Sequence, residues 1–230
     1  MVERRPLATV ISHLVLILGV ILVAFPLYIT FVASTHTAQD IVQVPMPLLP
    51  GPHLVENYTA AMLGTSGSAA STAPVGRMMT VSLVMALVIA LGKIAISLLS
   101  AFAIVYFRFP GRQFFLTVPD ELVEAARVDG AGPLRFFKDV LLPLSTTSIA
   151  ALFVIQFIYG WNQYLWPLQV TSSEDMYPVV MGIKRMISGG DAANDWNIVM
   201  ATAILAMIPP ALVVMLMQKW FVKGLVDTEK

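Results

Sequence analysis

Four long apolar stretches constrain this chain more than any other feature. They cover roughly residues 8–33, 79–106, 147–169 and 197–222. A helix needs about 20 apolar residues to cross the hydrocarbon core of a bilayer, and each stretch is long enough for this. Because lipid offers no hydrogen-bond partners to an open backbone, such segments cross a membrane as helices. The sequence therefore predicts an all-α integral membrane protein with four transmembrane helices.

The overall composition agrees with a membrane protein. Of the 230 residues, 57% are hydrophobic and 12% are charged, and there is no cysteine. A water-soluble fold would have to bury four core helices that have almost no polar face. The absence of cysteine excludes disulfides, thiolate metal ligands and a cysteine nucleophile. We expect a single membrane domain over residues 1–230.

The first apolar stretch also has features of a secretory signal peptide, because Arg4 and Arg5 precede it. Its apolar run is longer than the about 7–15 residues of a signal-peptide core. We therefore expect an uncleaved first span.

Lysine and arginine residues are unevenly distributed between the loops, although the formal net charge is zero. With four spans and a cytoplasmic N-terminus, ten of them lie on the inner side, namely Arg4, Arg5, Arg108, Arg112, Arg127, Arg135, Lys138, Lys219, Lys223 and Lys230. The outer side holds Arg77, Lys184 and Arg185. Because cytoplasmic loops carry the excess of positive charge, both termini and the loop 113–145 are predicted to be cytoplasmic.

The inner loop between the second and third spans carries start and stop signals for a helix. Thr117 followed by Asp120 fits a capping box, and Pro119 suits the first turn. Gly130 is suited to end the helix, because glycine adopts the left-handed backbone conformation at little cost. The loop therefore predicts a short helix over roughly residues 118–129.

The segment that contains this helix reads EAARVDGAGPLRFFKDVLLP and resembles the "EAA" loop of bacterial ABC importer permeases. The matching positions are Glu124, Ala125, Ala126, Asp129, Gly130, Ala131, Phe137, Leu142 and Pro143. In that family the loop forms a coupling helix that lies in a groove of the cytoplasmic ATPase. The residues that the resemblance assigns to this docking are Glu124, Ala125, Ala126, Asp129 and Gly130. The two alanines would leave a shallow surface for the partner; the alternative is an ordinary amphipathic loop helix.

The resemblance extends over nearly the whole chain, through the segments ERRPLATVISHLVLILGV, GKIAISLLSAFAIVYFRFPGR, FIYGWNQYLWPL and FVKGLVDTEK. These are similar to carbohydrate-type permeases, and among them to the second permease subunit of sn-glycerol-3-phosphate importers. The resemblance implies a bacterial cytoplasmic (inner) membrane location and an assembly with a second permease subunit, two ATPase subunits and a periplasmic binding protein. It implies that this chain binds no cofactor itself, because the partner ATPase uses the ATP. The substrate would be sn-glycerol 3-phosphate, or another sugar or polyol.

The chain departs from this family at the junction Arg112–Gln113. Family members have six spans, and the sequences on the two sides of the junction resemble segments that flank two further helices. Roughly fifty residues, the length of two spans and their connections, are therefore predicted to be missing. Losing two spans together keeps the sidedness of everything that follows. Two functions stay open: a transporting permease subunit, and a shortened subunit that docks the ATPase without transporting.

The sequence offers no catalytic or metal-binding constellation. It has no Gly-x-x-x-x-Gly-Lys-Ser/Thr loop, so ATP hydrolysis by that route is not expected. His13, His36 and His53 are scattered, without the spacing of metal ligands. We expect a transport subunit that is not an enzyme, holds no metal and does not bind nucleic acid.

Four polar side chains within or near the spans are candidates for the substrate pathway, namely Lys93, Gln156, Asn162 and Gln163. Polar groups at such depth usually face a bundle interior or a cavity. Lys93 needs either an anionic substrate or a permanent partner on the other permease subunit, and both interpretations stay open. The alternative for Gln156 is a hydrogen bond to a neighbouring helix, and the alternative for Asn162 and Gln163 is a place in an interfacial belt. Pro209 and Pro210 are expected to interrupt the fourth span.

Overall fold

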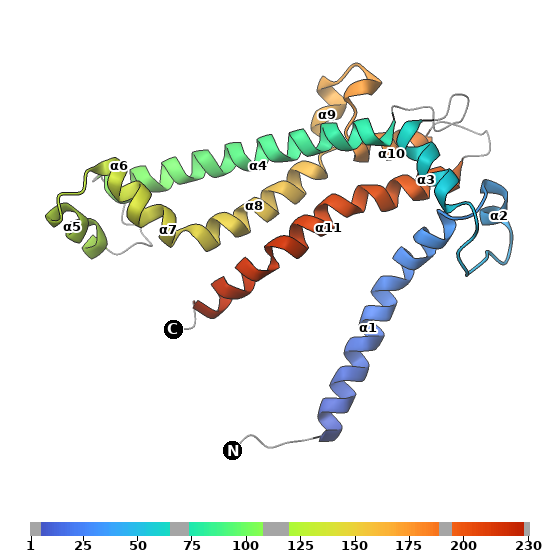
Figure 1. Cartoon of the computed structure of the whole chain (residues 1–230), viewed down its shortest axis with the longest axis horizontal. Coiled ribbons are helices and arrows are strands. Elements are labelled where there is room, and N and C mark those ends of the chain that lie inside the picture. The colour runs from blue at the N-terminus through green and yellow to red at the C-terminus, as the bar shows by residue number, and fades with distance from the viewer. Residues whose placement is uncertain (1–5, 65–73, 108–119, 189–194, 228–230) are drawn as a thin grey trace. The chain divides into compact units, whose positions relative to one another are not determined.

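The computed structural model describes residues 6–64, 74–107, 120–188 and 195–227. Within these ranges the elements are helices, and the ranges contain no β-strand (Figure 1). The chain divides into two compact units. The first unit comprises Met1–Thr80 and Tyr164–Ile208, and the second comprises Val81–Gln163 and Pro209–Lys230.

Three long helices contain most of the apolar sequence. They are α1 (Pro6–Ala33), α4 (Val75–Tyr106) and α11 (Trp196–Asp227). The parts that are long and apolar enough to cross a membrane are Val10–Ala33, Val75–Tyr106 and Trp196–Trp220. These helices coincide with the first, second and fourth apolar stretches of the sequence.

The third predicted span, residues 147–169, is not one helix. α8 (Thr146–Trp161) is followed by three non-helical residues and then by the short α9 (Leu165–Val170). At 1.5 Å per residue, the 16 residues of α8 extend about 24 Å, less than the about 30 Å of a hydrocarbon core. α8 and the preceding helical segment Pro133–Leu144 pass the length and apolarity test together, but they are bent by 71°. The described residues thus hold three candidate spans, or four if this bent pair counts as one.

The sequence of the bent pair explains its irregular course. α6 (Pro133–Phe136) continues through a π-helical turn (Phe137–Leu141) into α7 (Leu142–Leu144). Pro143 cannot donate a backbone hydrogen bond, and its ring would clash with the carbonyl one regular turn back. A wider turn relieves this clash, and the amide of Leu142 accordingly donates to the carbonyl of Phe137, five residues back. The chain then changes direction at Ser145 and enters α8.

In the second unit, α4 and α8 lie side by side and approach each other closely (Figure 1). Ala86 of α4 is fully buried, and Gly160 of α8 lies against it. A Cβ atom on Gly160 would lie 2.8 Å from the Cα of Ala86, so the helix backbones would have to separate to admit any larger residue. Phe157 and Trp161 are 1% and 2% exposed and flank this contact on α8. Small residues therefore set the spacing of the two helices.

In the first unit, a buried asparagine connects three helices. Asn57 of α3 (Leu54–Leu63) is 4% exposed, and its side-chain amide donates to the carbonyl oxygens of Ser34 and His36, both at 2.9 Å. The side-chain amide of Asn197 in α11 donates to Asn57 Oδ1 at 2.8 Å. Because buried polar groups need partners, this network fixes the end of α1 relative to α3 and α11.

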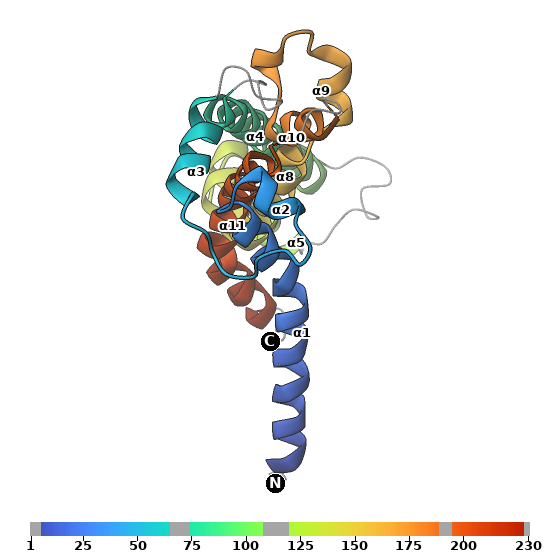
Figure 2. The same ribbon diagram turned by 90° about the vertical axis from the view of Figure 1, so that its right-hand side faces the viewer.

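The remaining elements of the first unit are short: α2 (Ala38–Val42), the 3₁₀ turn Glu174–Met176 and α10 (Val179–Ser188). α2 follows the C-terminal end of α1 (Figure 2). It begins with a capping box, in which the Thr37 hydroxyl accepts from the Asp40 amide and the Asp40 carboxylate accepts from Thr37. Hydrogen bonds from the side chain and the backbone of Thr37 lower the pKa of Asp40 below its usual value.

Pro209 and Pro210 do not interrupt the fourth span, contrary to the expectation from the sequence. α11 runs as one helix from Trp196 to Asp227 with both prolines inside it. Prolines are tolerated in transmembrane helices because local adjustments and neighbouring groups satisfy the carbonyls that they free. The division between the two units nevertheless falls between Ile208 and Pro209.

The close approach of α4 and α8 gives a stability prediction. Replacing Gly160 with valine should lower the free energy of unfolding by about 1–3 kcal/mol, because the added atoms meet the backbone of Ala86. Thermal unfolding of the purified chain in detergent measures this change. The matched control is Gly92→Val in α4, where nothing lies within 4 Å of an added Cβ. Equal destabilisation by the two substitutions would contradict the close contact.

Candidate functional site

The helix predicted between the second and third apolar stretches is present as α5 (Asp120–Val128). Its last residue agrees to within one position with the predicted end at residue 129. The predicted N-terminal signals at Thr117 and Pro119 lie outside the described residues.

Gly130 ends α5 in the predicted way. It has a φ of 72°, in the left-handed region. The Gly130 amide donates to the carbonyl of Arg127 at 3.1 Å, and the Ala131 amide donates to the carbonyl of Ala126 at 2.9 Å. These two bonds form a Schellman motif, which satisfies carbonyls that the helix end leaves open. The predicted role of Gly130 as a C-terminal cap is confirmed.

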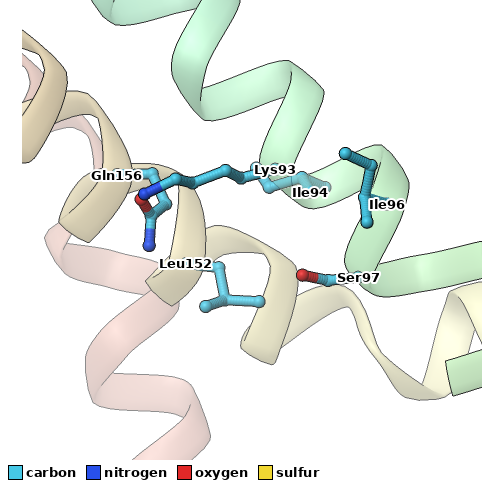
Figure 3. Close-up of a pocket in the computed structure, with 6 residues that line it drawn as sticks. All are labelled: Lys93, Ile94, Ile96, Ser97, Leu152 and Gln156. Carbon is cyan, nitrogen blue, oxygen red and sulfur yellow. The ribbon is translucent and has the colours of Figure 1, made fainter. Parts of the chain in front are cut away.

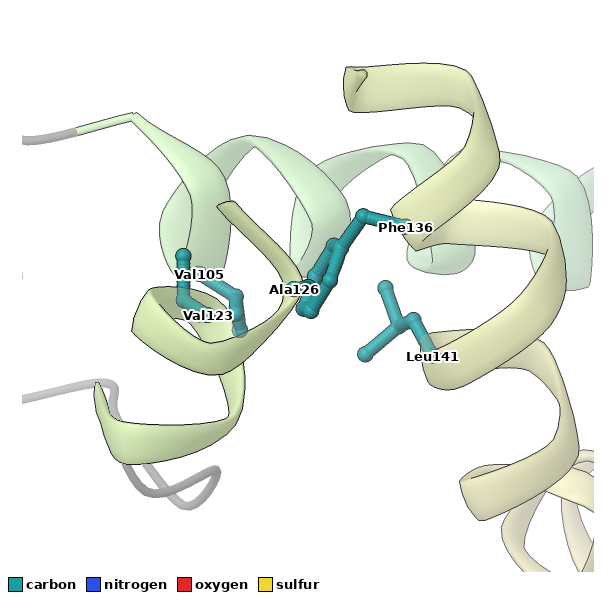
Figure 4. Packing of buried hydrophobic residues seen from close by; sticks show 5 residues of the cluster. All are labelled: Val105, Val123, Ala126, Phe136 and Leu141. Atoms are coloured by element: carbon teal, nitrogen blue, oxygen red, sulfur yellow. The ribbon is translucent and has the colours of Figure 1, made fainter. Parts of the chain in front are cut away.

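The inner face of α5 packs into a cluster of five buried side chains, which we call the coupling-loop cluster (Figure 4). Its members are Val105, Val123, Ala126, Phe136 and Leu141. They come from the end of α4, from α5, from α6 and from the π turn. Phe136 is the largest of them and is 1% exposed, so its ring is enclosed by the other elements of the loop. The cluster gives α5 a fixed position on the second unit.

The burial of Ala126 corrects the prediction that both alanines form an exposed docking surface. Ala126 is 9% exposed and belongs to the coupling-loop cluster, whereas Ala125 is exposed. Successive residues of a helix point about 100° apart, so one alanine faces inward while its neighbour faces outward. Ala126 can therefore support a docking surface by positioning α5, and only its neighbour can touch a partner directly.

Arg127 is a second anchor of α5, which the sequence analysis did not single out. Its Nη2 atom donates to the carbonyl of Tyr106 at 3.2 Å, and its guanidinium carbon lies 5.0 Å from the centroid of the Tyr106 ring. Tyr106 is the last residue of α4, where carbonyls lack partners within the helix and the helix dipole favours a cation. No sequence signal pointed to this contact, because the two residues lie 21 positions apart on different helices.

The exposed surface around α5 carries polar side chains and small residues. Glu124, Ala125 and Asp129 are exposed on or beside α5, and Gly130 is exposed after it. On the following turn, Arg135 and Asp139 form an exposed ion pair with 3.4 Å between Nε and Oδ2. The described residues of this region expose charges and one small side chain, and they bring together no nucleophile and base. The geometry fits docking better than catalysis.

A second candidate region lies between α4 and α8 in the second unit (Figure 3). It is a pocket of about 170 Å³, lined by Lys93, Ile94, Ile96, Ser97, Leu152 and Gln156. The Lys93 ammonium lies 4.3 Å from the centroid of the Tyr159 ring, and no ion pair of Lys93 occurs among the described residues. The structure thus brings together two of the four predicted pathway residues, Lys93 and Gln156. Tyr159 was missed, because its meeting with Lys93 depends on the contact between the helices.

The other two pathway candidates serve the end of α8. The side-chain amide of Asn162 donates to the carbonyl of Ile158 at 2.9 Å, and that of Gln163 donates to the carbonyl of Tyr159 at 3.2 Å. Neither residue lines the pocket that contains Lys93. The Gln163 side chain serves a carbonyl that no regular backbone bond occupies, whereas the Ile158 carbonyl also accepts from the backbone amide of Asn162. Both side chains therefore bond locally to the end of α8.

In the part of the chain that the structure describes, no group of three or more histidine, aspartate or glutamate side chains could hold a metal ion. The ring of His36 bonds through Nε2 to the carbonyl of Leu49 at 2.8 Å. Nδ1 of His53 lies 2.9 Å from a carboxylate oxygen of Glu56. These two histidines hold local structure in the first unit.

Known proteins match this chain over its full length. The sn-glycerol-3-phosphate transport system permease protein UgpE of Agrobacterium fabrum is 50% identical over 283 residues, with 100% of both sequences covered. The proteins of the same name from Rhizobium meliloti and from Escherichia coli O1:K1 / APEC are 47% and 45% identical with the same coverage.

The alignments with these relatives are longer than the chain itself. They run over 283 residues, which is 53 more than the 230 residues present. The difference has the size of the loss predicted at Arg112–Gln113. That junction lies outside the described residues, and the position of the loss stays a prediction.

A solved structure and a protein-family model also match this chain. A chain of a bacterial ABC transporter involved in the import of the acidic polysaccharide alginate shares the fold, with a TM-score of 0.68 over 96% of this chain and 99% of that chain at 17% identity. The family described as binding-protein-dependent transport system inner membrane component matches residues 5–227. This chain therefore belongs to the family of binding-protein-dependent transport system inner membrane components.

Proposed function

We propose that this chain is a permease subunit of an ABC importer for sn-glycerol 3-phosphate. The substrate assignment rests on the names of relatives that are 45–50% identical over 283 residues. The proposed assembly contains a second permease subunit, two ATPase subunits that use the ATP, and a periplasmic binding protein. The proposed orientation places both termini in the cytoplasm, as the distribution of lysine and arginine indicates.

The observation that carries this proposal is that α5 is held in a fixed position with one face exposed. Val123 and Ala126 hold its inner face in the coupling-loop cluster, while Glu124 and Ala125 stay exposed on its outer face. A docking element has to be rigid, because a loosely held helix would absorb the movement of its partner. The Schellman motif at Gly130 and the contact of Arg127 with α4 add to this rigidity.

The same packing gives a route for coupling within the second unit. The coupling-loop cluster contacts α4 through Val105, and it contacts the π turn through Leu141. The π turn continues through α7 and Ser145 into α8. A displacement of α5 by the ATPase would therefore be passed by direct contact to α4 and α8, the two helices that line the Lys93 pocket. Nucleotide-driven movement of the ATPase would change the access to that pocket.

A second function has one observation in its favour. The chain is 53 residues shorter than its alignments, which is enough for two membrane spans. A subunit that lacks two spans would keep α5 and would dock the ATPase, but its translocation pathway would be incomplete. The two functions differ in transport and share ATPase binding.

Reconstitution tests the proposed transport directly. The chain is assembled with its three kinds of partner in lipid vesicles, and uptake of labelled sn-glycerol 3-phosphate is followed. We expect saturable uptake that requires ATP and the binding protein. A complex that assembles and hydrolyses ATP without uptake contradicts the first function and supports the shortened subunit.

The mass of the native protein separates the two functions independently. A chain of the present length has a mass of 25.0 kDa. A native protein about 5 kDa heavier, at roughly a tenth of a kilodalton per residue, would contain the two predicted spans and supports the complete importer. Mass spectrometry of the protein from its own membrane gives the answer, and a native mass at the lower value supports the shortened subunit.

Gly130 gives the sharpest test of the coupling helix. Replacing it with valine should uncouple ATP hydrolysis from uptake, because a β-branched residue at a φ of 72° costs about 1 kcal/mol or more and distorts the helix end. An added Cβ meets nothing within 4 Å there, so the effect would come from the backbone alone. The ratio of ATP hydrolysed to substrate imported is measured.

Gly132 supplies the matched control for this substitution. It also has open space around an added Cβ, but its φ is −71°, which any residue adopts. We expect Gly132→Val to keep the wild-type ratio. Unchanged coupling in both variants, with normal assembly, would show that α5 is not the coupling element.

A further inference from the structure

The Lys93 pocket combines one cation with two uncharged polar groups on adjoining helices. Lys93 and Ser97 stand one turn apart on α4, and Gln156 faces them from α8 (Figure 3). Ile94 and Leu152 belong to the apolar part of the lining. Residues four positions apart share a helix face, so the register of α4 places the ammonium and the hydroxyl on the same side. The pocket thus has charge, hydrogen-bonding groups and an apolar wall.

Two of these groups lack a full complement of polar partners in the described residues. The oxygen Oε1 of Gln156 is buried and accepts no hydrogen bond. The Lys93 ammonium rests on the face of the Tyr159 ring, which supplies negative potential but no lone pair along an N–H direction. A buried acceptor without a donor costs free energy. Lys93 is exposed on this chain, but it stands near the middle of a membrane-spanning helix, where a charge without a partner is also costly. A ligand with an anionic group and a hydroxyl donor would relieve both costs.

The size and depth of the pocket narrow the class of ligand. Its volume of about 170 Å³ lies below the range of about 300–1,000 Å³ that is usual for drug-sized molecules, so the ligand is small. Lys93 is 18 residues after Val75 and 13 residues before Tyr106, close to the middle of α4. At 1.5 Å per residue, about 20 Å of helix separate it from the nearer end. A soluble phosphate ester in the pathway fits this depth better than a lipid headgroup at the membrane surface.

Resting on the proposed function, we propose that this pocket binds a small phosphorylated polyol during its passage, and that Tyr159 holds Lys93 while the pocket is empty. The Lys93 ammonium binds the phosphate, and the Ser97 hydroxyl donates to a second phosphate oxygen. Gln156 Oε1 accepts from a hydroxyl of the polyol. When the ligand enters, its phosphate replaces the Tyr159 ring as the partner of Lys93. A neutral polyol lacks the anion and is bound weakly.

Chemical labelling of a single cysteine tests this proposal without depending on transport. The chain has no cysteine, so Leu152→Cys introduces a unique thiol in the apolar part of the pocket lining and keeps the three polar groups. The full complex is treated in membranes with a water-soluble methanethiosulfonate reagent, and the label on this chain is measured after its isolation. sn-Glycerol 3-phosphate, inorganic phosphate and glycerol are the added ligands.

We expect sn-glycerol 3-phosphate to slow the labelling about tenfold at a concentration about ten times its dissociation constant, because only the empty pocket reacts. Glycerol should give no protection, and inorganic phosphate should protect at higher concentrations. Adding Lys93→Met to the Leu152→Cys chain should abolish the protection. If sn-glycerol 3-phosphate does not protect the cysteine in the chain that keeps Lys93, the proposal is overturned, even where uptake is normal. Protection in a complex that does not import supports this pocket and contradicts the proposed transport function.

The Tyr159 part of the proposal has its own pair of variants. Tyr159→Leu removes the ring that competes for Lys93, so sn-glycerol 3-phosphate should protect at a concentration severalfold lower. Tyr159→Phe keeps the ring face and should leave the protecting concentration unchanged. An unchanged value in the leucine variant contradicts the competition between ring and phosphate.

A comparison of lipids separates a soluble ligand from a headgroup. The labelling is repeated in vesicles of phosphatidylcholine alone and in vesicles that contain phosphatidylglycerol, whose headgroup is also a glycerol phosphate ester. We expect the same labelling rate in both without added ligand. Protection by phosphatidylglycerol, combined with none by sn-glycerol 3-phosphate, overturns the proposal in favour of a lipid site.

Discussion

The burial of Phe136 is the interaction on which the coupling region depends. Its ring is 1% exposed and joins α5 to the end of α4 and to the π turn in one apolar cluster. Fully burying a phenylalanine side chain stabilises a contact by about 1.5–3 kcal/mol. Without this burial, the charged helix α5 would have few apolar contacts with the rest of the chain. The packing of one face of α5 in this cluster determines which residues its opposite face exposes.

Small residues between α4 and α8 determine how these two helices pack in the apolar part of the chain. Ala86 and Gly160 let the two backbones approach, and this approach brings Lys93 next to Tyr159 and Gln156. Close helix packing without large side chains is typical of membrane proteins, where lipid competes with every apolar contact. The pocket is therefore a consequence of how α4 and α8 pack, and both helices are connected to the coupling-loop cluster.

The sequence predicted the features that depend on local chemistry. Three apolar stretches became long helices, because their length alone requires them in lipid, and Gly130 took the left-handed conformation that suits glycine. Features that depend on distant residues were missed or misplaced. The inward direction of Ala126 depends on Phe136 and Leu141, ten and fifteen positions later. The break after Trp161 was not predicted either. Predicting Tyr159 as the partner of Lys93 would have required the register of α4 against α8.

We propose that α5 docks the ATPase through its exposed face while Ala126 stays inside the coupling-loop cluster. Neighbouring cysteines test it most directly, because the chain contains no other thiol. A short bifunctional reagent is applied to the assembled importer, with Ala125→Cys and Ala126→Cys compared. We expect the cysteine at 125 to cross-link to the ATPase and the one at 126 not to. Any cross-linking from 126, or none from either position in an intact complex, would contradict this docking.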